Sequence, residues 1–175
     1  MITIYLTRHG QTEENIARIF QGHLPGHLTE EGKQQAINLG QRLKGLKIDA
    51  IVSSDLQRVK DTINLALPCG NLPWETTPLL REIDWGKWTG LKISSVDTTQ
   101  IPDDAESKQM LYERAGKWLR DFCKRYKGKT VLVVGHGLIN RSIQAHILGI
   151  DAEHLCEVKH MDNAEVRKYV IDHLQ

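Results

Sequence analysis

Residues 129–137 read KTVLVVGHG, an apolar run of strand length that ends in a histidine between two glycines. A strand without polar alternation is buried on both faces, which is typical of a parallel sheet covered by helices on either side. A similar junction opens the chain, where residues 2–7 are mostly apolar and Arg8, His9 and Gly10 follow at once. These two stretches predict an α/β fold with polar groups where strands end.

Strand and helix signals alternate outward from these stretches. Residues 28–46 show the helical signal, since Leu39 and Leu43 recur at helix spacing and Thr29 suits an N-cap. The alternation predicts one α/β domain over residues 1–175, with a mainly parallel sheet covered by helices on both faces. The expected strands are residues 2–7, 48–54, 74–78, 129–136 and 165–173, the expected helices are residues 28–46, 55–67, 105–126 and 137–149, and residues 79–90 and 94–104 are expected loops.

The composition is that of an ordinary soluble globular protein, with 40% hydrophobic and 26% charged residues. A formal net charge of +1 gives no bulk electrostatic argument for binding nucleic acid or a membrane surface. No run of about 18 apolar residues predicts a membrane-spanning helix, and the first residues lack a secretory signal pattern. Three scattered cysteines, Cys69, Cys123 and Cys156, predict free, buried thiols in a reducing cytoplasm.

The junctions after the strands collect residues that suit an anion. Ligands of parallel sheets bind at the carboxyl ends of the strands, where Arg8, His9 and His136 are expected. Arg58 lies at the start of the helix after the second strand, and Glu82 lies in an aromatic, glycine-rich loop. Guanidinium groups match pairs of phosphate oxygens as forks. Two arginines and two histidines therefore predict a compact site for a phosphate group.

The local backbone supports this interpretation, although each residue taken singly has an alternative. The helix that follows His136 offers N–H groups and a favourable dipole to an anion, and Gly10 and Gly137 allow a ligand to approach the backbone closely. An arginine beside a histidine is often merely solvated, Glu82 has Arg81 as a local partner, and a histidine between glycines also caps turns. The joint occurrence at strand ends argues against coincidence.

Four motifs, in this order, resemble the histidine phosphatase superfamily, also called the phosphoglycerate mutase-like family. They are LTRHGQTEEN (residues 6–15), SSDLQRVKDT (53–62), LREIDWGKWTG (80–90) and VVGHG (133–137). The resemblance spans nearly the whole chain. It implies a phosphoglycerate mutase-like fold, a three-layer α/β/α sandwich around a mainly parallel sheet.

The resemblance also implies roles for the candidate residues. His9 corresponds to the phosphoryl acceptor, Arg8 and Arg58 to phosphate-binding arginines, and His136 to the second histidine of the site. Glu82 corresponds to the proton donor. The expected substrate-binding residues are Thr12, Asn15 and Gln21, which follow from the resemblance, and Gly137, which follows from its freedom of backbone approach.

The chemistry of these side chains agrees with those roles. A histidine with an ordinary pKa of about 6.5 is largely neutral at pH 7, so a ring nitrogen is free to attack phosphorus. Arginines and a second histidine offset the charge of the transferring group. Glu82 in its neutral form supplies the proton that the leaving oxygen needs. Neither a metal ion nor another cofactor is expected.

The sequence therefore predicts a cytoplasmic phosphatase that hydrolyses small phosphate monoesters through a phosphohistidine on His9. The expected partner is a small phosphorylated metabolite, with α-ribazole phosphate, sugar phosphates and glycerate phosphates among the candidates. One alternative is a mutase-type phosphoryl transferase. Another is a non-catalytic relative that only binds phosphorylated ligands, but such a protein is expected to have lost part of the catalytic set. The oligomeric state is left open.

A departure from the family pattern and a group of tryptophans concern the surroundings of the site. Asp55 stands where proline is commoner, and it is expected to add a negative charge close to the phosphate. Trp85, Trp88 and Trp74 are candidates for an apolar wall that stacks on a substrate ring, with core packing as the alternative.

The remaining histidines are not expected to bind metal. His23 and His27 have helical ligand spacing, but Pro25 and Gly26 lie between them and break any helix. Surface or packing positions are expected for His146, His154, His160 and His173.

Overall fold

A five-stranded sheet organises the molecule, and the computed structural model describes residues 1–172. The strand order is β3-β2-β4-β1-β5; the first four of these strands run parallel, and β5 pairs antiparallel with β1 at one edge. The prediction of a mainly parallel sheet is therefore confirmed. The strands are β1 (Ile2–Arg8), β2 (Ala50–Ser54), β3 (Trp74–Thr77), β4 (Thr130–Gly135) and β5 (Val166–Ile171).

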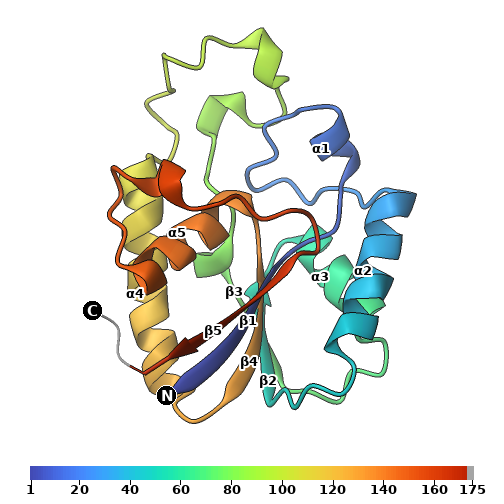
Figure 1. Ribbon diagram of the computed structural model, residues 1–175. Helices are drawn as coiled ribbons and strands as arrows, with labels where there is room; N and C mark the ends of the chain where they lie inside the picture. The colour runs from blue at the N-terminus through green and yellow to red at the C-terminus, as the bar shows by residue number, and fades with distance from the viewer. Residues whose placement is uncertain (173–175) are drawn as a thin grey trace.

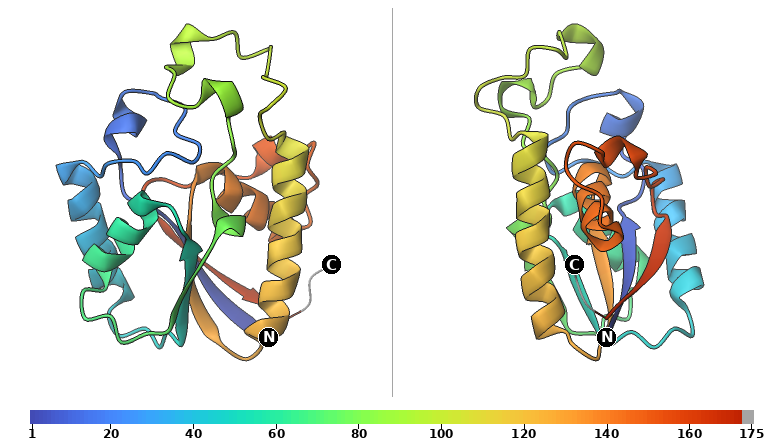
Figure 2. Two further views of the ribbon diagram at one scale, coloured as in Figure 1. Left: turned by 180° about the vertical axis from the view of Figure 1, so that it is seen from behind. Right: turned by 60° about the vertical axis from the view of Figure 1, so that its left-hand side comes forward.

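Helices cover both faces of the sheet, as Figures 1 and 2 show, with α2 and α3 packed together on one face and α4 and α5 on the other. This is the expected three-layer α/β/α arrangement. Within residues 1–172, no helix is sufficiently long and apolar to span a bilayer. The α-helices are α1 (Glu13–Ile16), α2 (Glu30–Leu43), α3 (Gln57–Ala66), α4 (Lys108–Arg125) and α5 (Gly137–Leu148), and the short 3-10 helices are η1 (Pro78–Leu80), η2 (Gly86–Trp88), η3 (Ile93–Ser95) and η4 (Leu155–Glu157).

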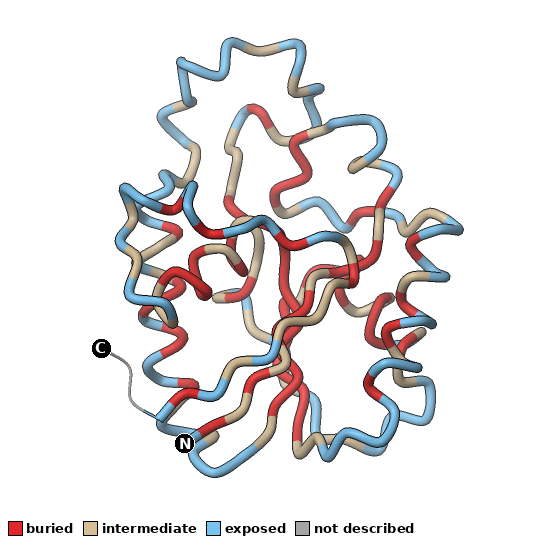
Figure 3. Tube along the Cα trace, in the orientation of Figure 1, coloured by how far each residue is buried: buried red, intermediate tan, exposed pale blue. Residues whose placement is uncertain are grey.

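The apolar run of β4 forms the centre of the core. Val131 and Val133 belong to the cluster beneath α4 and α5, whereas Leu132 and Val134 belong to the cluster beneath α2 and α3. All four side chains are fully buried, and the central strands are the most continuously buried part of the trace in Figure 3. The unbroken hydrophobicity of this strand thus reflects a helical layer on each side.

Caps define where the long helices begin. The Thr29 hydroxyl accepts a hydrogen bond from the Gly32 N–H at the start of α2, and Ser107 caps α4 in the same way. Leu39 and Leu43 lie on the buried face of α2. The helix ends at Leu43, so the expected helix of residues 28–46 was too long at its carboxyl end.

Smaller differences separate the expected and observed elements. The short helix α1 was not predicted; it is nucleated by a capping box in which Thr12 and Asn15 bond to each other's backbone N–H groups. The second strand begins at Ala50 rather than at residue 48. The strand expected over residues 165–173 is present as β5, while residue 173, and with it His173, lies outside the described residues.

The prediction that the cysteines are buried is wrong. Cys69 and Cys156 are exposed and Cys123 is partly buried, all three as free thiols. Cys69 lies in the turn after α3 and Cys156 in η4, and both segments run over the surface. A free thiol thus carries little information about burial where the chain around it forms a surface connection.

Two long connections lie over the carboxyl ends of the parallel strands. Residues 10–28, drawn in blue, and residues 81–106, drawn in green to yellow, form the upper part of the molecule in Figure 1. They are joined where the Phe20 N–H donates to the Leu91 carbonyl at 3.0 Å. These connections enclose the site described next.

Candidate active site

A cavity of about 150 Å³ lies at the carboxyl ends of the strands, between the two connections. Arg8 reaches it from the end of β1 and His9 from the next position; Arg58 reaches it from the first turn of α3, and Glu82 from the segment after η1. Four side chains expected in the site therefore line one cavity, as the rule for parallel sheets predicts.

His9 is held as a neutral imidazole with one free nitrogen. Its Nδ1 lies 2.7 Å from the Gly10 carbonyl oxygen, which only accepts hydrogen bonds, so Nδ1 carries the proton. Nε2 keeps its lone pair and accepts from the Arg58 Nε–H at 3.3 Å. Burial, and then the charges of Arg58 and Arg8, hold the His9 pKa well below its ordinary value. The ring is therefore an unprotonated base at neutral pH.

Gly10 and Gly137, the glycines that follow the two histidines, lie where the protein packs too closely for a side chain. A Cβ at Gly10 would lie 2.5 Å from the Gly32 carbonyl oxygen in the first turn of α2, so the chain after β1 approaches that helix closely. A Cβ at Gly137 would lie 3.1 Å from the ring of His160 and 3.6 Å from the guanidinium of Arg8. Both glycines make room for protein groups, whereas the sequence suggested that they make room for a ligand.

Arg58 is almost completely buried beside His9. Its Nη2 donates to the Gly22 carbonyl at 2.9 Å and its Nη1 to the Leu24 carbonyl, so the loop before α2 fixes the guanidinium plane. Burial lowers the Arg58 pKa to about 10, which leaves the group charged at neutral pH. The geometry presents a fixed positive charge to any group attached to His9 Nε2.

Replacing Arg58 with lysine is expected to lower kcat/KM by on the order of a hundredfold, the scale of one lost charge-stabilising donor. An ammonium group keeps the charge but lacks the planar fork that bonds to two carbonyls and to His9 at once. Steady-state kinetics on one phosphate ester measure the loss. Arg125→Lys, at an exposed position on α4, is the matched control and should retain wild-type kinetics. A loss below threefold for Arg58→Lys would remove this arginine from the chemistry.

His136 and Arg8 each bring an unsatisfied nitrogen to this end of the sheet. The His136 ring is fully buried, its centre lies 5.2 Å from that of His9, and its Nε2 is 2.8 Å from the Ser54 hydroxyl. His136 Nδ1 and Arg8 Nε are buried without a hydrogen-bond partner among the described residues. Buried polar groups are rarely left unpaired, and an oxyanion beside His9 would satisfy both.

Glu82 occupies the amino end of α5. Its carboxylate accepts from the Leu138 N–H at 3.0 Å and from the Ile139 N–H at 3.1 Å. The sequence suggested that a bound phosphate would take these N–H groups, and that expectation is wrong because Glu82 already does. These two hydrogen bonds fix the carboxylate within the cavity.

The two neighbouring charges considered from the sequence neutralise each other. Arg81 forms a bidentate pair with Asp55, with N···O distances of 2.8 and 2.7 Å. Glu82 therefore does not pair with Arg81, and the Arg81 guanidinium holds the Asp55 pKa below its ordinary value. Asp55 thus adds no uncompensated negative charge to the site.

The expected substrate-binding residues differ in what they contact. Asn15 and Gln21 line the cavity. Thr12 is completely buried behind them; its hydroxyl donates to Gln21 Oε1 at 3.0 Å and accepts from the Asn15 N–H at 3.1 Å. Thr12 therefore orients the two lining residues and does not itself line the cavity.

The three tryptophans have three different surroundings. Trp85 lines the cavity beside Phe20. Trp88 is buried and stacks on Phe20, with ring centres 5.1 Å apart, and its ring centre lies 6.2 Å from that of Trp85. Trp74 lies on the edge strand β3, where its indole N–H donates to Ser53 at 2.8 Å. Trp85 thus forms the wall, Trp88 supports it, and Trp74 belongs to neither the wall nor the core.

Sequence reasoning missed two polar residues that contact the site. His160 is exposed, as expected, but its Nε2 lies 2.9 Å from Arg8 Nη1. The Asn163 side-chain amide donates to the His9 carbonyl at 3.1 Å. Both residues come from the segment before β5, about 150 positions along the chain, and no local sequence signal marks them.

His23, His27 and His146 have protein partners. His23 Nε2 lies 3.0 Å from the Glu82 carbonyl, and His27 pairs with Glu14 at 2.7 Å. His146 packs between α5 and α4 against Tyr112. Across residues 1–172, the side chains include no group of three or more His, Cys, Asp or Glu with the geometry for a metal ion.

Comparison with known proteins places this site in a family. The profile of the histidine phosphatase superfamily (branch 1) matches residues 4–175, and the chain therefore belongs to that superfamily. A protein called probable phosphoglycerate mutase GpmB, from Salmonella arizonae, is 34% identical over 169 residues, which cover 87% of this chain and 77% of that protein.

Solved structures of relatives share the whole fold. YhfR of Bacillus stearothermophilus is 29% identical and superposes with a TM-score of 0.91, covering 99% of this chain and 95% of its own. The mycobacterial glucosyl-3-phosphoglycerate phosphatase, solved with VO3, is 26% identical with a TM-score of 0.82, covering 95% and 91% of the two chains. The relatives are thus named as mutases and as phosphatases, and together they support an enzyme of one of these two kinds.

Proposed function

We propose that this protein is a phosphatase that hydrolyses small phosphate monoesters through a phosphohistidine on His9. The observation that carries the proposal is the state of His9: a buried, neutral imidazole whose Nδ1–H is bonded to Gly10 and whose Nε2 lone pair faces a fixed guanidinium. Such a nitrogen is an activated nucleophile for phosphorus.

The first step transfers the phosphoryl group to the enzyme. His9 Nε2 forms a bond to phosphorus as the ester P–O bond breaks, and the leaving oxygen takes a proton from Glu82. Arg58 lies against the position of the transferring group, and Arg8 and His136 contribute the two unsatisfied nitrogens. Their donors are in place before charge develops, which is the main requirement for stabilising such a transition state.

The second step restores the enzyme. A water molecule attacks phosphorus, the N–P bond breaks, and His9 recovers its lone pair. Glu82, now ionised, accepts the proton of the water and returns to its acidic form. Inorganic phosphate and the alcohol are the products, and the proton leaves Glu82 and returns to it once per turnover.

The lining of the cavity favours a phosphatase over a mutase. Beyond the phosphate-binding groups the lining consists of the amides of Asn15 and Gln21 and of apolar side chains, and the cationic side chains among the lining residues, Arg8 and Arg58, are those assigned to the phosphoryl group. A glycerate phosphate brings a carboxylate that needs a further cation, whereas an apolar or aromatic alcohol suits these walls. The apolar lining residues are Ile19, Phe20, Trp85, Ile93 and Leu138.

The proposal is tested with a panel of phosphate monoesters measured as kcat/KM, with and without excess EDTA. We expect hydrolysis that EDTA leaves unchanged, inhibition by vanadate, and aryl or other apolar esters as the preferred substrates. Mutase activity on 3-phosphoglycerate in excess of its hydrolysis would favour the transferase instead. Reproducible inactivation by EDTA with recovery on adding a divalent ion would overturn the metal-independent mechanism.

A further inference from the structure

Residues 160–164, which we call the strap, run between η4 and β5 across the carboxyl end of β1 (Figure 1). The Ala164 N–H lies 3.0 Å from the Arg8 carbonyl and 3.2 Å from the His9 carbonyl. The Asn163 side chain donates to the His9 carbonyl as well. The strap therefore holds the backbone of Arg8, the last residue of β1, and of His9, which follows it.

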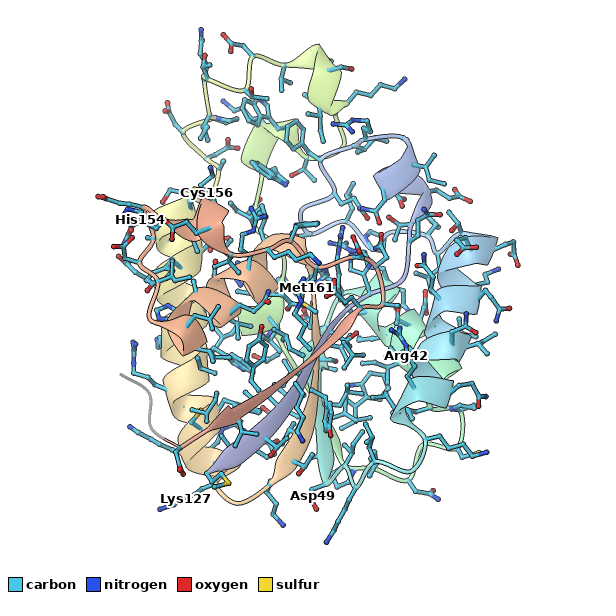
Figure 4. The ribbon with its side chains drawn as sticks, in the orientation of Figure 1. Arg42, Asp49, Lys127, His154, Cys156 and Met161 are labelled. Carbon is cyan, nitrogen blue, oxygen red and sulfur yellow. The ribbon has the colours of Figure 1, made fainter. Side chains whose placement is uncertain are left out.

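The strap also holds the side chain of Arg8. Nη1 donates to the Met161 carbonyl at 2.9 Å and lies 2.9 Å from His160 Nε2. Met161 is labelled in Figure 4, over the ends of the strands. Since a guanidinium has only donors, His160 Nε2 must accept, which requires a neutral ring with its proton on Nδ1. Arg8 Nη1 thus has two acceptors, whereas the buried Nε–H has no acceptor among the described residues.

The absence of a side chain at Gly137 leaves room for His160 and Arg8 to pack against the start of α5. The position that a Cβ of Gly137 would take is 3.1 Å from His160 Cε1 and 3.6 Å from Arg8 Cζ. The imidazole and the guanidinium therefore pack together against the bare backbone at the start of α5. A side chain at residue 137 would push one of them away.

We propose that His160 is a positioning residue, whose neutral imidazole fixes the Arg8 guanidinium so that its Nε edge meets the phosphoryl group. The inference rests on the proposed function and deepens it, because it makes phosphate recognition depend on a titratable group outside the four motifs. Protonation of His160 would remove the acceptor and place a second cation beside Arg8.

The charges around His160 determine how phosphate recognition by Arg8 depends on pH. Burial, then Arg8 on β1 and Arg141 on α5, lower the His160 pKa, while Glu82 and Asp162 oppose them. The ring is therefore neutral at pH 7, and the acceptor is lost only as the pH falls below its ordinary value of about 6.5. His9 is more deeply buried and its pKa is lowered further, so acidification reaches His160 first.

The test compares His160→Gln and His160→Leu in the full chain, using p-nitrophenyl phosphate. Glutamine offers a carbonyl oxygen as a non-titrating acceptor, and leucine offers none. At pH 7.5 we expect His160→Leu to lose about tenfold in kcat/KM, the scale of one hydrogen bond to a charged group, and His160→Gln to stay within about threefold. The acidic limb of the kcat/KM profile should lose its upper inflection in His160→Gln. Ionisation of the substrate is common to all the proteins, so their difference isolates His160.

His154→Gln and His154→Leu are the matched controls. His154 lies at the outer edge of the molecule in Figure 4, where it pairs with Asp151 at 2.6 Å, and both variants should keep the wild-type profile. A wild-type rate in His160→Leu, or a wild-type acidic limb in His160→Gln, would overturn the inference.

Binding of inorganic phosphate, measured by calorimetry, separates this inference from the proposed function. If the wild type hydrolyses no ester, the proposed function fails, but weaker phosphate binding by His160→Leu together with near wild-type binding by His160→Gln still supports the positioning role. Equal phosphate affinity in the wild type and both variants overturns it.

Discussion

Replacing His9 with alanine is expected to lower kcat/KM by at least about 10⁴-fold, because removing a catalytic nucleophile costs the covalent route itself. Arg8, Arg58 and His136 would remain, so the variant should still bind phosphate and vanadate. Folding should be retained, since His9 is not among the residues with positive φ and the neighbouring hydrogen bonds of the strap use the His9 carbonyl. His154→Ala, at an exposed position, is the control for loss of a histidine.

The structure also specifies where the phosphoryl group should be attached. Since Gly10 holds the Nδ1 proton, the free nitrogen is Nε2, and the intermediate should be phosphorylated there. Rapid mixing with a phosphate-labelled ester, followed by an alkaline quench, should trap label that survives base and is lost in acid. Attachment at Nδ1, or equal labelling of the wild type and His9→Ala, would contradict the mechanism.

The pH dependence of this step follows from burial. The His9 pKa is depressed, so the ring stays unprotonated through neutral pH, and the nucleophile is lost only on acidification. Its own titration should therefore lie below the ordinary value for histidine. An acidic limb at a pH above the His9 titration is expected to report His160, or the ionisation of the substrate, and His160→Gln distinguishes these two sources.

The part of the site that lies at the carboxyl ends of the strands could be predicted from the sequence. Arg8, His9 and His136 follow strands that run parallel in one sheet, and the carboxyl ends of such strands meet at one edge. Arg58 begins the helix after β2 and reaches the same edge. For these residues, the local sequence pattern is sufficient to predict the position in the fold.

The rest of the site depends on contacts between distant segments. Nothing local to residues 160–164 indicates that they fasten Arg8 and His9, because the pairing arises from β5 adding to the edge of the sheet beside β1. The Arg81–Asp55 pair and the Glu82 contact with α5 likewise join separate elements. Adjacency in sequence suggested Arg81 as the partner of Glu82. In the fold, Arg81 pairs with Asp55 and Glu82 contacts the N–H groups of α5.

The expectations for the cysteines and for Trp74 were wrong for a related reason. Residue type predicts average burial, but Cys69, Cys156 and Trp74 lie in a turn, a short surface helix and an edge strand. Position in the sheet decides exposure in these cases. The prediction from the apolar run of β4 was confirmed because a central strand buries its residues on both faces, here all those after Thr130.

Replacing Glu82 with glutamine is expected to slow the hydrolysis of alkyl phosphates by on the order of 10³-fold, within the usual range for general acid–base catalysis. Glutamine keeps an oxygen to accept from the N–H groups of Leu138 and Ile139, so the geometry at the start of α5 should survive. What it lacks is the proton for the leaving oxygen. The thermal midpoint and vanadate binding should therefore stay close to wild type.

The leaving group provides an internal control for this role. The acid role requires a proton on Glu82 when the substrate is bound, and how much the reaction depends on that proton is set by the leaving group. A nitrophenolate leaves with little protonation, so Glu82→Gln should slow p-nitrophenyl phosphate far less than an alkyl ester. Equal losses on both substrates would show that Glu82 only stabilises charge or structure, and Asp84, two residues further along, would then be tested as the acid in the same pair of assays.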